Sequence, residues 1–525
     1  MPNLTQRYSG VLLHPSSLPS PYGIGDFGEG AFKFIDFLKK SGQTIWQVLP
    51  FGPTGYGDSP YQCFSAFAGQ PLFISPGELC KDGFLDRREL EFAPHFSPDS
   101  VDYGYVQYYK YPLYKRAFEK FLAEKDKAKP AIPKGMIKGF ENFEKNNASW
   151  LKDYALFMAL KDANGGIAFL DWPEEQAHPS AEGKKALQKK YEKEMMYYSF
   201  LQYIFFRQWS VVRAYANNAG IKIVGDIPIF VSMDSADVWA NPEMFRLDSK
   251  GYPTVVAGVP PDYFSETGQL WGNPLYDWEK HEKTGYAWWI SRIKNQLKVF
   301  DFIRIDHFRG FAGYWAIPYG DKTAVGGKWV KGPGHSLFDA IAGELGKDLP
   351  IWAEDLGVIT EDVEELRDAY GLPGMKVLQF AFADINDNDM MPYRFAGDNY
   401  ICYTGTHDND TSLGWYMSLD EEHKDKVRIY MNTSGDNIHW DMIRTAMAST
   451  AKYSVYPMQD LLGYGCDCRM NTPAVPYGNW QFRVRESNFN DGLADYLRML
   501  TGIFGRLPVD PSEDEEEEDK EVVEK

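Results

Sequence analysis

Short apolar runs recur along the chain, and longer amphipathic segments separate most of them. Several runs are continuous rather than alternating, which is typical of parallel strands covered on both faces. The predicted strands are Gly10–Pro15, Ile45–Pro50, Ile221–Phe230, Val299–Asp306, Leu349–Glu354, Met375–Phe382, Tyr400–Thr404 and Ser454–Leu461. Alternation of strand and helix predicts an α/β fold, and eight strands favour a (β/α)₈ TIM barrel over an open sheet.

The connection from about 71 to 195 is too long for a loop and carries its own helical patterns. We therefore predict a mostly helical subdomain inserted between the second and third strands. A second insertion, an active-site loop, is expected at about 231–280. Residues 1–507 then form a single catalytic domain, and 508–525 form an acidic, disordered tail, because a block of like charges cannot bury enough surface to fold.

Composition narrows the class of protein. A net charge of −19 repels nucleic acid and anionic membranes, so neither is an expected partner. The chain starts without a basic-then-apolar leader and lacks a membrane-spanning apolar run, which predicts a cytoplasmic location. The cysteines are few and odd in number, as in a reducing compartment. Cys466 and Cys468 have no partner pair with zinc-ligand spacing, so we expect no metal and no cofactor.

Acidic residues follow the predicted strands at Asp226, Asp306, Glu354 and Asp408. In a parallel barrel the carboxyl ends of all strands meet at one rim, so these acids should cluster there. Any one of them alone is equally well explained as a helix N-cap or a surface ion pair.

Two histidines, His307 and His407, leave a metal cluster as a further alternative. It is less favoured because no HExxH or comparable spacing accompanies them. Four strand ends that supply acids together, with Arg304 and His407 beside them, favour a catalytic site.

Cleavage of a glycosidic bond needs this set of groups: one carboxylate to attack carbon and a second, protonated one to donate to the leaving oxygen. Arg304 and Asp306 stand two apart, so both side chains lie on one face of a strand, where the cation keeps the acid ionised. Aromatics in polar, Gly/Pro-rich segments such as 268–276 suit a ligand with apolar faces and hydroxyl edges, as in a sugar ring.

At these residues the chain resembles the amylomaltases, the 4-α-glucanotransferases of the α-amylase clan, from about Gly10 to Arg506. The resemblance rests on ordered motifs at 14–18 (HPSSL), 59–62 (SPYQ), 225–230 (GDIPIF), 260–264 (PPDYF), 268–274 (GQLWGNP), 304–310 (RIDHFRG), 353–357 (AEDLG), 374–380 (GMKVLQF) and 406–409 (THDN). It implies a (β/α)₈ barrel with inserted subdomains. It also implies no calcium, because the motif after Asp226 lacks the Asn-His pair of amylases.

The resemblance implies roles for individual residues. Asp306 resembles the nucleophile, Glu354 the general acid/base and Asp408 the transition-state stabiliser. The implied substrate-binding residues are Arg304, His407, Tyr61, Asp226, Trp271, Phe380 and Asn273, with Trp271 and Phe380 as aromatic platforms. Tyr56 and Tyr103 match positions that hold a second, remote glucan in some members.

The implied reaction is retaining transfer of a 1,4-α-glucan segment to the 4-hydroxyl of an acceptor, with maltooligosaccharides and α-1,4-glucans as partners. An amylase-like hydrolase with the same three acids is the alternative. A non-catalytic glycan-binding protein is less favoured, because all three acids are present. A phosphate-binding barrel enzyme is less favoured, because the sequence has no strong phosphate-binding loop. Transfer requires that sugar outcompete water, and the segment Val255–Trp271 is expected to be a mobile cover that favours it.

Overall fold

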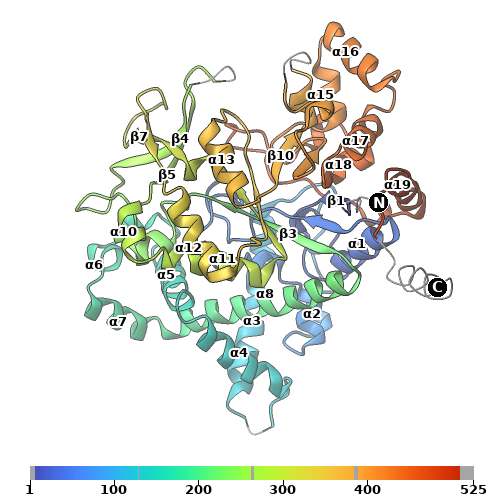
Figure 1. Cartoon of the computed structure of the whole chain (residues 1–525). Coiled ribbons are helices and arrows are strands. Elements are labelled where there is room, and N and C mark those ends of the chain that lie inside the picture. The colour runs from blue at the N-terminus through green and yellow to red at the C-terminus, as the bar shows by residue number, and fades with distance from the viewer. Residues whose placement is uncertain (1–5, 128, 262–264, 384–387, 509–525) are drawn as a thin grey trace, which may run out of the picture.

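Eight parallel strands form the centre of the computed structural model, which describes residues 6–127, 129–261, 265–383 and 388–508. In spatial order they are β10 (Gly374–Val377), β11 (Tyr400–Tyr403), β12 (Tyr453–Pro457), β1 (Tyr8–Leu12), β2 (Ile45–Gln47), β3 (Lys222–Pro228), β6 (Phe302–Asp306) and β9 (Ile351–Ala353). The N–H of Ala353 donates to the carbonyl of Pro373 at 2.9 Å, which joins the two ends of the sheet. The predicted α/β barrel is therefore confirmed (Figure 1).

The strands are short and almost wholly buried, as the continuous apolar runs indicated. Ile303 and Ile305 of β6 are fully buried between neighbouring strands and helices. A Cβ on Gly225 of β3 would come within 2.0 Å of the Phe300 ring, so only glycine allows this close packing. Because both faces of the strands are buried, a substrate can reach only side chains at the strand ends.

Helices surround the barrel. Those that pack around it are α1 (Glu29–Lys40), α8 (Glu192–Asn218), α11 (Ala287–Val299), α12 (His335–Leu345), α13 (Glu361–Ala369), α17 (Ile438–Ala448) and α19 (Asp491–Ile503). The helices α15 (Ser412–Ser418), α16 (Glu421–Met431) and α18 (Met458–Leu462) gather with α17 at one corner (Figure 1). The other short helices are α9 (Ala236–Ala240), α10 (Trp278–Lys283) and α14 (Leu378–Ala381).

The connection from β2 to β3 is mostly helical. It contains α2 (Pro76–Lys81), α3 (Tyr103–Lys125), α4 (Lys134–Asn146), α5 (Leu151–Ala163), α6 (Glu174–Ala177) and α7 (Ala181–Lys190), and it leads into α8. These helices lie together on one side of the barrel, in blue to green in Figure 1. The described part of the chain contains no helix that is both long and apolar enough to cross a membrane.

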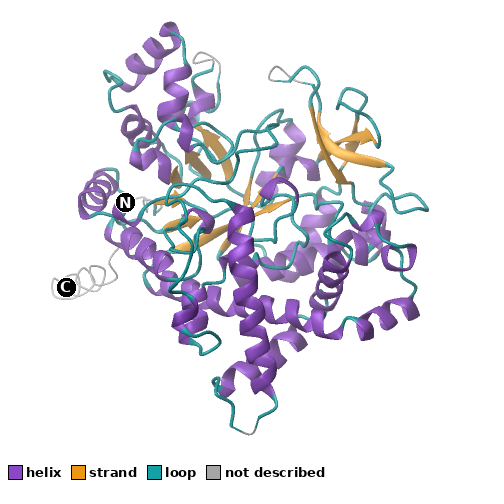
Figure 2. Cartoon of the chain, turned by 180° about the vertical axis from the view of Figure 1, so that it is seen from behind, coloured by secondary structure: helices purple, strands orange, loops and turns teal. Residues whose placement is uncertain are grey.

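A second sheet, which the sequence patterns did not predict, stands beside the barrel (Figure 2). It is antiparallel, in the order β5 (Gln269–Pro274), β4 (Val255–Val259), β7 (Gly313–Pro318) and β8 (Lys328–Lys331). The segment Val255–Trp271, expected to be a mobile cover within an active-site loop, forms strands at both of its ends. Pairing of β4 with β7 is a contact between distant segments, which local pattern does not reveal. Residues 262–264, within this segment, lie outside the described residues, as does the tail from 509.

Two predicted strands run on into α-helices. The run Met375–Phe382 changes from strand to helix after Val377, and the run Ser454–Leu461 does so after Pro457. A buried helical turn and a buried strand are both continuously apolar, so periodicity cannot separate them.

Candidate active site

Three neighbouring strands place three acids at one rim of the barrel. β3, β6 and β9 are adjacent, with Pro228 opposite Asp306 and Ile305 opposite Ala353. Asp306 and Glu354 therefore follow paired residues at the strand ends, while Asp226 lies opposite Arg304, two residues earlier along the neighbouring strand.

Arg304 connects two of these acids. Its Nη1 lies 2.6 Å from Oδ2 of Asp226, and its Nη2 lies 2.9 Å from Oδ1 of Asp306. Arg304 and Asp226 are buried, whereas the Asp306 side chain is 29% exposed. Burial raises the pKa of Asp226 to about 7; the Arg304 cation opposes this rise, and the nearby Asp306 carboxylate adds to it. Asp306 is thus the acid of this pair that solvent and ligands can reach.

Glu354 is held by two backbone N–H groups. Oε2 accepts from His307 at 2.6 Å and Oε1 accepts from Leu356 at 2.9 Å. Burial, followed by the charge of Asp306, raises the pKa of Glu354 to about 8. Glu354 is therefore mostly protonated at neutral pH. Its neighbouring acid, Asp306, is paired with Arg304.

Asp408 stands in the turn after β11, and its side chain is 45% exposed. Its Oδ1 lies 3.3 Å from Nε2 of His407 and accepts from Nδ2 of Asn471 at 2.7 Å. Arg469 donates to the Asp408 carbonyl at 2.5 Å. Sequence reasoning gave no role to Asn471 or Arg469, because both lie more than 60 residues from Asp408 along the chain.

Tyr61 contacts Asp226 with its hydroxyl and His407, the residue before Asp408, with its ring. Its hydroxyl donates to Oδ2 of Asp226 at 2.9 Å, and its ring stacks on His407 at 5.1 Å between centroids. Burial raises the pKa of Tyr61 well above its usual value and lowers that of His407. Tyr61 thus remains a hydrogen-bond donor, and the His407 ring is neutral at neutral pH. The structure brings together all seven residues at the centre of the predicted site: Tyr61, Asp226, Arg304, Asp306, Glu354, His407 and Asp408.

Two further predicted binding residues lie on β5. Trp271 is half-buried and meets the ring of His307 edge-on, at 4.8 Å and 85°. Asn273 is buried, and its amide donates to the Val231 carbonyl and accepts from Gln62. These contacts give Asn273 an internal role, while its binding role stays a prediction.

The contacts of the remaining predicted residues do not involve the three acids. Phe380 is on the turn α14 and is 39% exposed, so part of its ring is accessible. Tyr103 is buried, and its hydroxyl donates to the Trp480 carbonyl at 2.9 Å. Tyr56 begins the 3₁₀ turn Tyr56–Asp58, and its side chain is outside what the structure describes. A second glucan site at Tyr56 and Tyr103 stays a prediction.

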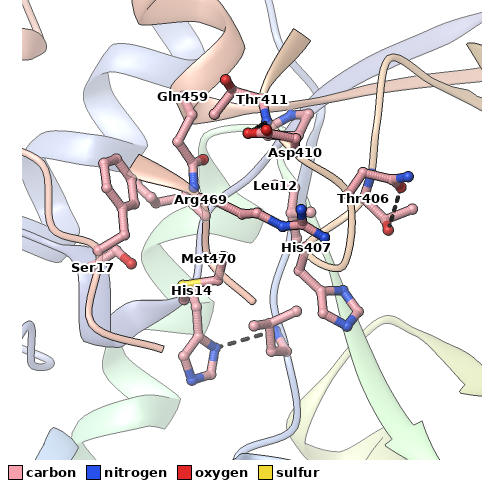
Figure 3. A pocket seen from close by; sticks show the side chains of 15 residues that line it. Leu12, His14, Ser17, Thr406, His407, Asp410, Thr411, Gln459, Arg469 and Met470 are labelled. Atoms are coloured by element: carbon pink, nitrogen blue, oxygen red, sulfur yellow. Dashed lines mark hydrogen bonds between the residues drawn. The ribbon is translucent and has the colours of Figure 1, made fainter. Parts of the chain in front are cut away.

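The residues on either side of Asp408 in the chain, His407 and Asn409, line a pocket. His407 and Arg469 line it together with His14, Thr406 and Asp410, as Figure 3 shows. Among the described residues there is no group of three or more His, Cys, Asp and Glu side chains that could hold a metal ion. The arrangement offers acid–base and nucleophilic chemistry from carboxylates.

A family model described as 4-alpha-glucanotransferase matches residues 13–488. The chain belongs to the 4-alpha-glucanotransferase family. Membership makes it a glycosyltransferase that acts on α-1,4-glucans. It is 48% identical to a 4-alpha-glucanotransferase of Synechocystis sp. over 505 residues, 96% of this chain and 99% of that one. It is also 48% identical to that of Thermus thermophilus over 514 residues, 95% of this chain and 99% of the relative.

Two solved structures share the fold of this chain. An amylomaltase from Streptococcus agalactiae, in complex with acarbose, matches with a TM-score of 0.91 and 38% identity, over 96% of this chain and 100% of that one. The amylomaltase from Corynebacterium glutamicum shares the fold, with a TM-score of 0.74 at 17% identity, over 96% of this chain and 75% of that one.

Proposed function

We propose that this enzyme transfers a segment of a 1,4-α-glucan to the 4-hydroxyl of an acceptor glucose or glucan, with retention, through a glycosyl–aspartate intermediate. The observation that carries the proposal is the contrast between two neighbouring acids. Glu354 is buried with a pKa near 8, whereas Asp306 is partly exposed and contacts Arg304. Two carboxyl groups in different environments take different roles, one as proton donor and one as nucleophile.

In the first step the Asp306 carboxylate bonds to the anomeric carbon as the glycosidic C–O bond breaks. The proton of Glu354 passes to the departing oxygen. In the second step the Glu354 carboxylate removes the proton of an acceptor 4-hydroxyl, which bonds to the anomeric carbon as the bond to Asp306 breaks. Glu354 is protonated again and Asp306 is free, so the cycle closes.

The other residues hold the sugar and its developing charge. Asp408 is accessible, and its Oδ1 is fixed by Asn471, which suits a carboxylate that stabilises a positively charged transition state. His407 and Tyr61 stack beside it and offer hydrogen-bonding groups to sugar hydroxyls. Arg304 holds the Asp306 carboxylate in place through an ion pair.

Maltooligosaccharides and longer α-1,4-glucans are the substrates that we propose. The amylomaltase of S. agalactiae forms a complex with acarbose, and the family similarity extends over nearly the whole chain. Trp271 and Phe380 expose part of their rings and serve as platforms for neighbouring glucose units.

The deciding experiment is incubation with maltotriose and analysis of the products. Glucose together with longer maltooligosaccharides is the expected result, because a sugar hydroxyl takes the glycosyl unit. If the products were shorter sugars alone, the enzyme would be the alternative, a hydrolase.

The assignment of the two acids is tested by Asp306→Asn and Glu354→Gln. Each should lower kcat by about 10⁴-fold or more, as for other residues that take part in bond making and breaking. Asp491→Asn and Glu486→Gln are the matched controls, because these acids are exposed, paired with surface lysines, and should leave kcat unchanged. Activity in either catalytic variant would contradict the assignment.

A further inference from the structure

His307, the residue after Asp306, has a left-handed backbone with φ 56° and ψ 48°. This conformation is uncommon for residues other than glycine, although His, Asn and Asp adopt it more readily than most. It ends β6 directly after Asp306 and turns the chain into the 3₁₀ segment Phe308–Phe311. The turn fixes where the peptide groups next to Asp306 point.

Two of those peptide groups bind Glu354. The N–H of His307 donates to Oε2 of Glu354 at 2.6 Å, and the N–H of Phe308 donates to the Glu354 carbonyl at 3.0 Å. The left-handed turn therefore ties the residue after Asp306 to both the side chain and the main chain of Glu354. A change of φ at His307 would move one of these donors relative to the other.

The ring of His307 makes a different contact. It is buried, with 8% exposed, and meets the Trp271 ring edge-on at 4.8 Å. A Cβ on Gly310 would come 3.2 Å from Cδ2 of His307, so glycine leaves space for the ring. Nε2 has no hydrogen-bond partner among the described protein atoms, and burial lowers the pKa of His307 to about 3, so the ring is neutral. It acts on Trp271 as an uncharged aromatic surface.

We infer that His307 is a positioning residue whose main chain holds Glu354 and whose ring supports Trp271, so that the proton donor and the aromatic platform keep one relative position. The inference rests on the proposed function for the roles of Glu354 and Trp271. A glucose unit that stacks on Trp271 is then aligned with the group that protonates its glycosidic oxygen. The two halves of this role reside in different atoms of one residue, so they can be separated.

His307→Asn isolates the ring. Asn tolerates the left-handed conformation, so the N–H to Glu354 remains while the contact with Trp271 is lost. The KM for maltotriose should rise about tenfold, the size that an edge-on aromatic pair supports. The basic limb of the pH profile of kcat/KM, which Glu354 sets, should stay at the same pH. His307→Phe restores a ring and should return KM towards the wild-type value.

His307→Val isolates the backbone when it is compared with His307→Asn. A β-branched residue strongly disfavours positive φ, so the turn changes and the N–H is withdrawn from Glu354. The carboxylate then loses a stabilising donor, the pKa of Glu354 rises, and the basic limb moves to higher pH than in His307→Asn. His307→Ala, which is milder, should move the limb in the same direction by less and replaces the valine variant if that does not fold.

Asn432→Val is the matched control for backbone strain. Asn432 is also left-handed, with φ 51°, but it ends α16 and takes no part in the site. This variant should lower Tm while KM and the pH profile stay unchanged. A shifted limb or a raised KM in this control would mean that the His307 effects are merely structural.

The outcomes separate the inference from the proposed function. A wild-type KM in His307→Asn overturns the ring role, and coincident basic limbs in the asparagine and valine variants overturn the backbone role. Either result, with Asp306→Asn and Glu354→Gln inactive, leaves the proposed function standing. An active Glu354→Gln with an unchanged basic limb would remove both the acid assignment and the inference built on it.

Discussion

The guanidinium of Arg304 lies 2.9 Å from the carboxylate of Asp306, two residues further along the same strand. The same guanidinium also contacts Asp226 on β3, so one buried cation faces two acids. This arrangement orients the Asp306 carboxylate and gives it a cationic partner.

Replacement of Arg304 should impair both activity and stability. Arg304→Met leaves Asp226 buried without a cation, which costs about 3–5 kcal/mol of unfolding free energy. Arg304→Lys keeps the charge but cannot contact both acids with a planar fork, so it should lose about 10²-fold in kcat/KM with a smaller loss of stability. Urea unfolding and maltotriose kinetics measure the two effects. A methionine variant with wild-type kcat/KM would show that Asp306 does not need this cation.

Glu354 should make stability fall as pH rises. Its pKa is raised from 4.5 to about 8 in the folded protein, so between these values the folded state binds more protons than the unfolded state. Its contribution to stability is therefore full below pH 4.5 and is lost as pH rises towards 8. Glu354→Gln removes this titration, so its Tm should gain on the wild type from about pH 5 to pH 8. Parallel Tm curves would contradict the raised pKa.

Asn471 should matter to catalysis through Asp408. Asn471→Ala removes a 2.7 Å hydrogen bond to Oδ1, so the carboxylate is less firmly held. We expect kcat to fall by about 10- to 100-fold, as for a hydrogen bond to a charged group. Asn490→Ala is the contrasting control: this residue caps α19, so its loss should lower Tm with no change in kcat. Unchanged kcat in Asn471→Ala would show that Asp408 is held by other contacts.

Tyr61→Phe tests the hydroxyl without the ring. The stacking on His407 remains, but Asp226 loses the donor at 2.9 Å. The pKa of Asp226 should then rise above about 7, and kcat/KM should fall about tenfold near neutral pH. Tyr464→Phe, which removes a hydroxyl that accepts from Asn488, is the control and should be neutral. Equal kinetics in both variants would exclude a role for the Tyr61 hydroxyl.

Strand positions were readable because each barrel strand is a short, continuously apolar run. The same property hid where the strands end: the turn that carries Phe380 and the turn after Pro457 are also apolar, and only the backbone conformation in the folded chain shows that they are helical. The hairpin of β4 and β5 escaped prediction because its stability depends on β7, about 60 residues later in the chain.

The sequence by itself determined which acids stand at the carboxyl ends of strands, because that order is a property of the chain. It also placed Arg304 and Asp306 on one face, because side chains of a strand alternate. The tertiary structure alone decided that Arg304 also contacts Asp226, that Asn471 holds Asp408 from 63 residues away, and that the peptide of His307 binds Glu354. Hydrogen bonds and the loss of water around a charge depend on distance in space, and the spacing of residues along the chain does not contain that distance.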